Sequence, residues 1–209
     1  MNEEQAVLDF FAKTENLPLA LSVAELVDRI REHNNTSFWR ALQQRINKVI
    51  ESNALQWTTQ VTDDKSSDGS LVGLYCQSIA GQTVFLRPML EQQFSGGHWR
   101  IYFGLMWSAE PGPEQLALPA VIALQDALQQ LGFKNNSSFL AWQWSRFYPR
   151  GKDFQLRFSQ HADALLADFE SLFSVLLVDH QQPIAAANHA LANARGSSPV
   201  SLAHLRRNV

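Results

Sequence analysis

The chain has 209 residues, 45% of them hydrophobic and 11% aromatic, and its 17 Lys and Arg against 20 Asp and Glu give a formal net charge of -3. A chain of this length and apolar content can bury a core of its own, which excludes a disordered chain and a collagen-like repeat. The one cysteine excludes a disulfide scaffold. Proteins that bind the phosphates of nucleic acids usually have a broad basic surface, which a chain with a net negative charge is not expected to have.

Three helices are predicted before residue 53. The first covers about residues 3–13. In the second, Ser22 and Glu25 have the spacing of a capping box. An Asn-Asn-Thr break at 34–36 separates the second helix from the third, whose apolar residues recur at helical spacing. The shortness of the break predicts that these two helices are antiparallel neighbours.

After residue 54 the apolar residues alternate with polar ones, a pattern typical of strands. Four strands are predicted, at 55–61, 71–77, 83–89 and 99–107. The segments between them are rich in Gly, Ser and Asp and are shorter than the dozen or so residues that a parallel crossover needs. We therefore predict an antiparallel meander over residues 55–107.

The second half of the chain mixes helices and strands. A helix at about 119–131 begins with a proline and ends before Gly132, and a fifth strand follows at 139–148. A short sixth strand at 154–158 and a long helix at about 160–178 complete the pattern. This is an α+β fold, with a five- to six-stranded mainly antiparallel sheet and helices at both ends of the chain.

We predict one domain over residues 1–180, in which a helical segment (residues 1–53) precedes a segment of sheet and helices (residues 54–180). Residues 181–209 are predicted to form a basic, marginally ordered tail. Residues 1–33 hold seven acids and three bases, whereas the tail holds three arginines and no acid. These opposite charges can attract each other within one chain or between two, so self-association is one predicted property.

The sequence contains no complete local catalytic motif. The loop Asp64–Gly69 matches the opening of a calcium loop, but Tyr75 stands where the bidentate acid is required. Metal-dependent nucleases use acidic residues followed by a lysine, as in Asp63, Asp64 and Lys65 of this chain. These three residues, however, lie in a loop after the predicted strand. The six histidines and the glycines match no zinc, nucleotide-binding or nucleophile-elbow spacing. We predict no catalytic, cofactor-binding or metal-binding residue, although an active site gathered from distant positions stays open.

Several predicted strands carry a face on which arginines mix with aromatic rings. The candidate binding residues are Arg87, Arg100, Tyr102, Trp142, Trp144, Arg146, Tyr148 and Arg150. Such a surface suits protein-binding hot spots and the stacking of single-stranded bases. The alternative is that helices cover both sheet faces, so that the rings are core and the arginines extend to its rim.

The start of the chain has Glu3 and Glu4 where a signal peptide needs positive charge, and no apolar run reaches the roughly 20 residues of a membrane span. We therefore expect a cytoplasmic protein without membrane contact, in which Cys76 is a core residue. The predicted function is a non-catalytic interaction or assembly module that binds a protein partner or a second copy. The alternative is a nucleic-acid-binding or nucleic-acid-processing accessory protein that uses the arginine and aromatic face, which the net charge disfavours.

Overall fold

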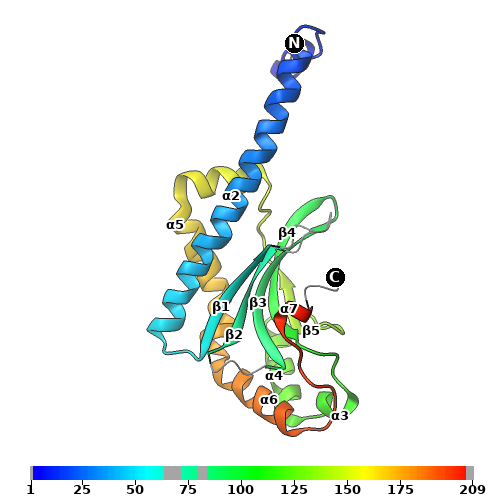
Figure 1. Ribbon diagram of the computed structural model, residues 1–209, viewed down its shortest axis with the longest axis vertical. Helices are drawn as coiled ribbons and strands as arrows, with labels where there is room; N and C mark the ends of the chain where they lie inside the picture. Colours follow the sequence, from blue (N-terminus) through cyan, green and yellow to red (C-terminus); the bar gives the residue numbers. More distant parts are fainter. Residues whose placement is uncertain (1, 64–71, 80–83, 206–209) are drawn as a thin grey trace. The chain divides into compact units, whose positions relative to one another are not determined.

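The computed structural model describes residues 2–63, 72–79 and 84–205. The chain divides into two compact units, Met1–Phe38 and Trp39–Val209. The fold belongs to the predicted α+β class, and the second unit contains a five-stranded antiparallel sheet (Figure 1).

Two helices, rather than the predicted three, precede the sheet: α1 (Glu3–Phe11) and α2 (Leu17–Ser52). The predicted break at 34–36 is wrong because α2 continues through it. Asn and Thr each cost at most about 0.7 kcal/mol of helix propensity, and no Gly or Pro occurs between residues 19 and 52. The predicted capping box is also wrong, since Ser22 lies inside α2 and its hydroxyl donates to the Pro18 carbonyl at 3.0 Å.

The sheet has the order β1-β2-β3-β4-β5, and each strand is antiparallel to its neighbours. The strands are β1 (Trp57–Asp63), β2 (Val72–Ser78), β3 (Leu86–Ser95), β4 (His98–Trp107) and β5 (Phe139–Trp144). The meander predicted over 55–107 is confirmed, whereas the loops predicted at 63–69 and 80–81 lie almost wholly outside the described residues. Gly96 and Gly97 join β3 to β4 with φ of 59° and 82°, as a two-residue type I′ hairpin turn requires.

The core lies on the sheet face that carries Phe103 and Leu105 of β4. Pairing with β3 places Leu90 opposite Phe103 on that face. The part of α2 that belongs to the second unit covers this face. The indole N–H of Trp39 in α2 donates to the Gln92 side-chain carbonyl at 3.1 Å. Leu42 and Ile46 of the same helix have no exposed surface, nor has Leu90.

Helices make up most of the remaining chain. They are α3 (Pro113–Leu116), α4 (Pro119–Gln130), α5 (Lys152–Ser174), the π-helical turn η1 (Val175–Asp179), α6 (Gln181–Asn193) and α7 (Leu202–Leu205). The predicted sixth strand at 154–158 is wrong, because α5 already begins at Lys152. Phe154 and Phe158 are four residues apart, a spacing that fits one face of a helix as well as alternate positions of a strand.

Residues 181–193, which the sequence suggested would be marginally ordered, form α6. Asn188 bonds this helix to the start of β3: its carbonyl accepts from the backbone N–H groups of Phe85 and Leu86, both at 2.9 Å, and its amide donates to the Leu86 carbonyl at 3.0 Å. The domain boundary at residue 180 stays a prediction. Among the described residues, no helix combines the length and apolar character needed to cross a membrane.

Candidate functional site

The sheet face opposite the core brings together several of the predicted binding residues. Tyr102 of β4 lies opposite Trp144 of β5, and Gly104 lies opposite Trp142. Arg100, two residues before Tyr102, shares their face because alternate residues of a strand point the same way. Four of the eight candidates therefore lie next to one another on β4 and β5.

The rings on this face pack edge to face. The centroid of Tyr102 lies 5.3 Å from that of Trp144 and 6.3 Å from that of Trp142, and the two indoles are 5.7 Å apart. A shift of register between Leu105 and Met106 also brings Phe139 onto this face, 5.7 Å from Tyr102. Each such pair contributes about 0.5–1.5 kcal/mol beyond area burial, so these rings form a structural cluster.

Arg100 covers one end of this ring cluster. Its guanidinium carbon lies 4.3 Å from the ring centroid of Trp144 and 5.7 Å from that of Tyr148, both within cation–π range. The Tyr148 ring also meets His98 edge-on at 5.9 Å, and Tyr148 is 44% exposed. The cluster thus reaches solvent at its Arg100 and Tyr148 end.

Arg87 and Glu91 introduce opposite charges into the buried part of the same face. The Nε and Nη2 groups of Arg87 both donate to the Ser108 hydroxyl oxygen at 3.1 Å, and the Tyr102 hydroxyl donates to a Glu91 carboxylate oxygen at 2.6 Å. Arg87, Glu91 and Ser108 are at most 2% exposed. Arg87 is therefore an internal residue. The prediction from sequence did not include Glu91. The feature that could have identified it is an acidic residue in an apolar segment, four residues after Arg87.

The chain's own C-terminal segment lies on this face. Leu202 of α7 is 2% exposed and packs in a cluster with Tyr75, Met89, Tyr102 and Met106. The backbone N–H of Val200 donates to the Ser108 carbonyl at 2.8 Å. Trp142 and Trp144 pack against the same cluster. The expectation that helices cover this face thus holds for the area beneath α7.

Arg146 lies apart from the ring cluster. The predicted alternation ends at Trp144, because the Ser145 N–H and hydroxyl both donate to the Ile101 carbonyl, at 2.8 and 2.7 Å. Arg146 instead pairs with Asp168 of α5 at 2.7 Å, and Arg157 pairs with the same carboxylate at 2.9 Å. The hydrogen bond from Arg146 is the largest cause that lowers the pKa of Asp168.

Arg150 and Cys76 are also separate from the ring cluster. The Arg150 guanidinium lies 4.8 Å from the ring centroid of Trp99, whose side chain belongs to the opposite face of β4. Cys76 is fully buried, and this burial raises the pKa of its thiol. A buried thiol of this kind is not a nucleophile at neutral pH.

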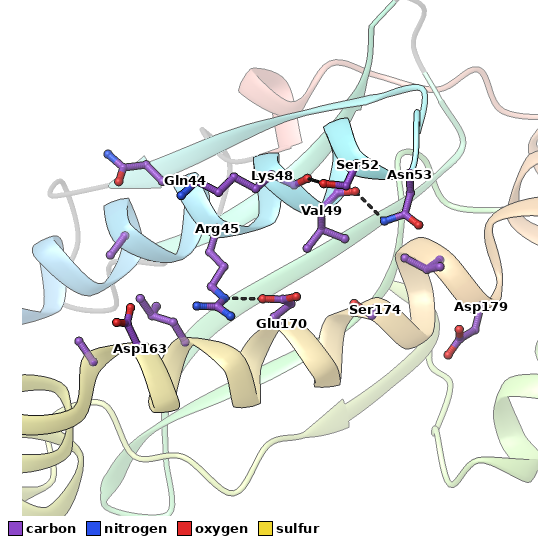
Figure 2. A pocket seen from close by; sticks show the side chains of 14 residues that line it. Gln44, Arg45, Lys48, Val49, Ser52, Asn53, Asp163, Glu170, Ser174 and Asp179 are labelled. Carbon is purple, nitrogen blue, oxygen red and sulfur yellow. Dashed lines mark hydrogen bonds and ion pairs between the residues drawn. The ribbon is translucent and has the colours of Figure 1, made fainter.

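A groove of about 800 Å³ runs between α2 and α5 in the second unit (Figure 2). Basic residues Arg45 and Lys48 line its α2 wall, and Asp163, Glu170 and Asp179 line the other wall. An ion pair between Arg45 and Glu170 bridges the two helices. This ion pair therefore joins α2 to α5 across the groove.

No group of three His, Cys, Asp or Glu side chains close enough to hold a metal ion occurs within residues 2–63, 72–79 and 84–205. The loop residues Asp64 and Lys65, whose types suggested metal chemistry, lie outside those ranges.

Many exposed large apolar side chains lie in the first unit, where the sequence predicts packed helices. Ten large apolar side chains there are 37–58% exposed: Val7, Leu8, Phe10, Leu17, Leu19, Leu21, Val23, Leu26, Val27 and Ile30. No residue from 2 to 34 is buried. The spacing of these residues was visible in the sequence, but their exposure among the described residues was not.

Comparison with known proteins gives no match: no family model, no curated protein and no solved structure is significantly similar to this chain.

Proposed function

We propose that the protein is a non-catalytic interaction module that binds a protein partner through the apolar side chains of α1 and the first half of α2. The exposure of these ten side chains is the observation that supports the proposal. Monomeric proteins rarely expose apolar patches larger than about 300–600 Å², and larger patches mark interaction sites.

The energetics of helices point the same way. Short helices are marginal in water by themselves, and most helical stability in proteins comes from packing an apolar face against another element. The nine-residue α1 is short, and no residue from 2 to 34 is fully buried, so α1 gains little of that packing. A partner that covers these residues would supply it.

The introduction of charge on one side of α2 tests the proposal. Leu26→Lys with Ile30→Lys should abolish binding, because both side chains are more than half exposed and would lie in the contact. Glu114→Gln with Gln130→Lys is the matched control: it changes the net charge by the same amount at exposed positions of the second unit. Immobilised wild-type chain, variant and control are incubated with purified chain and with cell extract, and retained protein is quantified by mass spectrometry. Equal retention by all three would contradict the proposal.

The nucleic-acid alternative remains a second proposal, and the Arg100 guanidinium over Trp144 beside the exposed Tyr148 is the observation that favours it. An arginine and rings open to solvent suit a single-stranded backbone and its bases. A fluorescent oligonucleotide should then bind more weakly as salt rises, and Trp144→Ala should weaken binding at every salt concentration. Absence of binding at about 50 mM salt would remove this alternative.

A further inference from the structure

We propose that the end of the β3–β4 hairpin binds a single-stranded nucleic acid, which crosses the hairpin turn and contacts both faces of the sheet. The hairpin end comprises residues 94–100 together with Tyr148 and Arg150. This inference rests on the nucleic-acid proposal above and adds to it a second face and a path between the two faces. The supporting observations are two pairs of arginine and ring, two exposed rings, a bare turn and an excess of positive charge.

Two arginines lie over rings on opposite faces of β4. The Arg100 guanidinium carbon lies 4.3 Å from the ring centroid of Trp144, and the Arg150 guanidinium carbon lies 4.8 Å from that of Trp99. Trp99 and Arg100 are neighbours in β4, so their side chains point to opposite faces of the sheet. Stacking uses the flat face of a guanidinium, and the N–H groups in its plane can still donate to a phosphate oxygen.

Each arginine has an exposed ring beside it. Phe94 lies opposite Trp99 in the hairpin, the two ring centroids are 5.8 Å apart, and Phe94 is 57% exposed. On the other face, Tyr148 is 44% exposed, and its ring centroid lies 5.7 Å from the Arg100 guanidinium carbon. The bases of a single strand stack on such rings whatever their sequence. Each face therefore offers a ring for a base and a guanidinium for a phosphate.

The turn between the two faces is bare. Gly96 and Gly97 have no side chains, and a Cβ atom at either position would meet no described atom within 4 Å beyond its chain neighbours. A flexible strand can therefore pass over the turn from the Phe94 side to the Tyr148 side. Duplex DNA has a persistence length of about 50 nm and is too stiff to follow so sharp a path.

The hairpin end is a basic region of an acidic chain. Residues 92–100 and 142–152 hold four Arg and Lys and no acid, although the whole chain has a formal net charge of -3. Among the described residues, neither Arg100 nor Arg150 pairs with a carboxylate. Such arginines attract phosphates, and the counterions released on contact contribute to the affinity.

The acids of the adjoining segments leave these two charges in place. Asp168 accepts from two other arginines at 2.7 and 2.9 Å. Glu91 is buried and accepts from the Tyr102 hydroxyl at 2.6 Å. Asp153 is offset by Lys152, the residue before it. A surface that keeps the charge of two arginines between exposed rings has a polyanion with stacking bases as its complement.

Fluorescence anisotropy with a labelled oligo(dT) of about twelve nucleotides tests the charges of the site. Two phosphate contacts in a single strand predict a slope of about 1.4 for log Kd against log salt, which is about a sevenfold loss of affinity between 50 and 200 mM. Arg150→Gln should halve this slope. Arg195→Gln makes the same change of charge at an exposed position after α6 and should leave the slope unchanged. Circular dichroism confirms that each variant is folded.

Phe94→Ala tests the second face. The loss of one stacked base should weaken binding roughly 5- to 150-fold at every salt concentration, without a change of slope. Ile122→Ala removes an apolar side chain of 45% exposure from α4 and should bind the oligonucleotide as wild type does. Equal binding by Phe94→Ala and Ile122→Ala would overturn the inference.

The outcomes separate this inference from the proposals above. If Trp144→Ala weakens binding but Phe94→Ala and Arg150→Gln do not, the nucleic-acid proposal stands and the path across the turn is overturned. Unlabelled duplex that competes as well as unlabelled oligo(dT) would also overturn the path. Equal competition by polyglutamate would indicate an acidic protein partner, and it would overturn both, as would absence of binding at about 50 mM salt. The apolar surface of α1 and α2 is tested separately, through other residues.

Discussion

Gly104→Ala is expected to destabilise the protein by more than about 3 kcal/mol, or to prevent its folding. A Cβ atom at Gly104 would lie 2.1 Å from the Ala141 carbonyl oxygen and 2.8 Å from the Trp142 Cα. Both contacts are with backbone atoms, so no rotation of a side chain can relieve them. β5 would have to move away from β4, and the rings of Trp142 and Trp144 would lose their contact with Tyr102.

Gly112→Ala is the matched control for that variant. A Cβ atom there would have its nearest contact at 3.9 Å, and the backbone φ of -76° suits any residue. The control should stay within about 0.5 kcal/mol of wild type, as most surface substitutions do. Urea denaturation followed by circular dichroism measures both variants. Similar midpoints for the two alanine variants would show that β5 does not pack against Gly104 as described.

Alternation predicted which residues of β4 share a face, because β3 pairs with this strand along its whole length. It failed at Arg146, where strict alternation continues past Trp144 but the chain turns to bond Ile101. It also could not place Phe139 beside Tyr102, since the register shift that brings it there depends on how β5 pairs with β4.

Helical periodicity showed a different limitation. Asn34, Asn35 and Thr36 are weak helix formers, yet α2 passes through them because no Gly or Pro forces an end. Phe154 and Phe158 fit a strand and a helix equally well, and only tertiary packing decides between the two. The helical spacing of the apolar residues in α1 and the first half of α2 was visible in the sequence. Whether another segment of the same chain covers these residues depends on tertiary structure, which the spacing does not indicate.

Prediction of the candidate site from the sequence was limited for the same reason: local patterns carry no information about long-range contacts. Alternation placed Arg100 with Tyr102 on one strand face and Trp142 with Trp144 on another, and only the register of β4 with β5 shows that the two faces are the same. The burial of Arg87 depends on Ser108, and the covering of the face depends on Leu202, about a hundred residues later in the chain. Contacts of that sequence separation leave no local signal.

Leu202→Ala is expected to release the segment that ends in α7 and to expose the sheet face beneath it. The substitution empties a site that is 2% exposed, which costs about 2–4 kcal/mol in a core that cannot collapse. The segment is also held by Leu205, which packs against the same cluster, by Val200, which donates to the Ser108 carbonyl at 2.8 Å, and by Gln115, which donates to the Ser197 carbonyl at 3.2 Å. Local detachment should therefore precede global unfolding.

Limited proteolysis and tryptophan fluorescence measure this detachment. A loss of about 2–4 kcal/mol raises the detached fraction roughly 30- to 900-fold, so cleavage between residues 194 and 205 should accelerate by a similar factor. The emission should shift to longer wavelength, because Trp142 and Trp144 pack against the cluster that Leu202 covers. His204→Ala, an exposed change in the same short helix, should leave both readouts unchanged. Equal protease resistance of Leu202→Ala and wild type would mean that backbone hydrogen bonds, and not the leucine, hold the segment on the sheet.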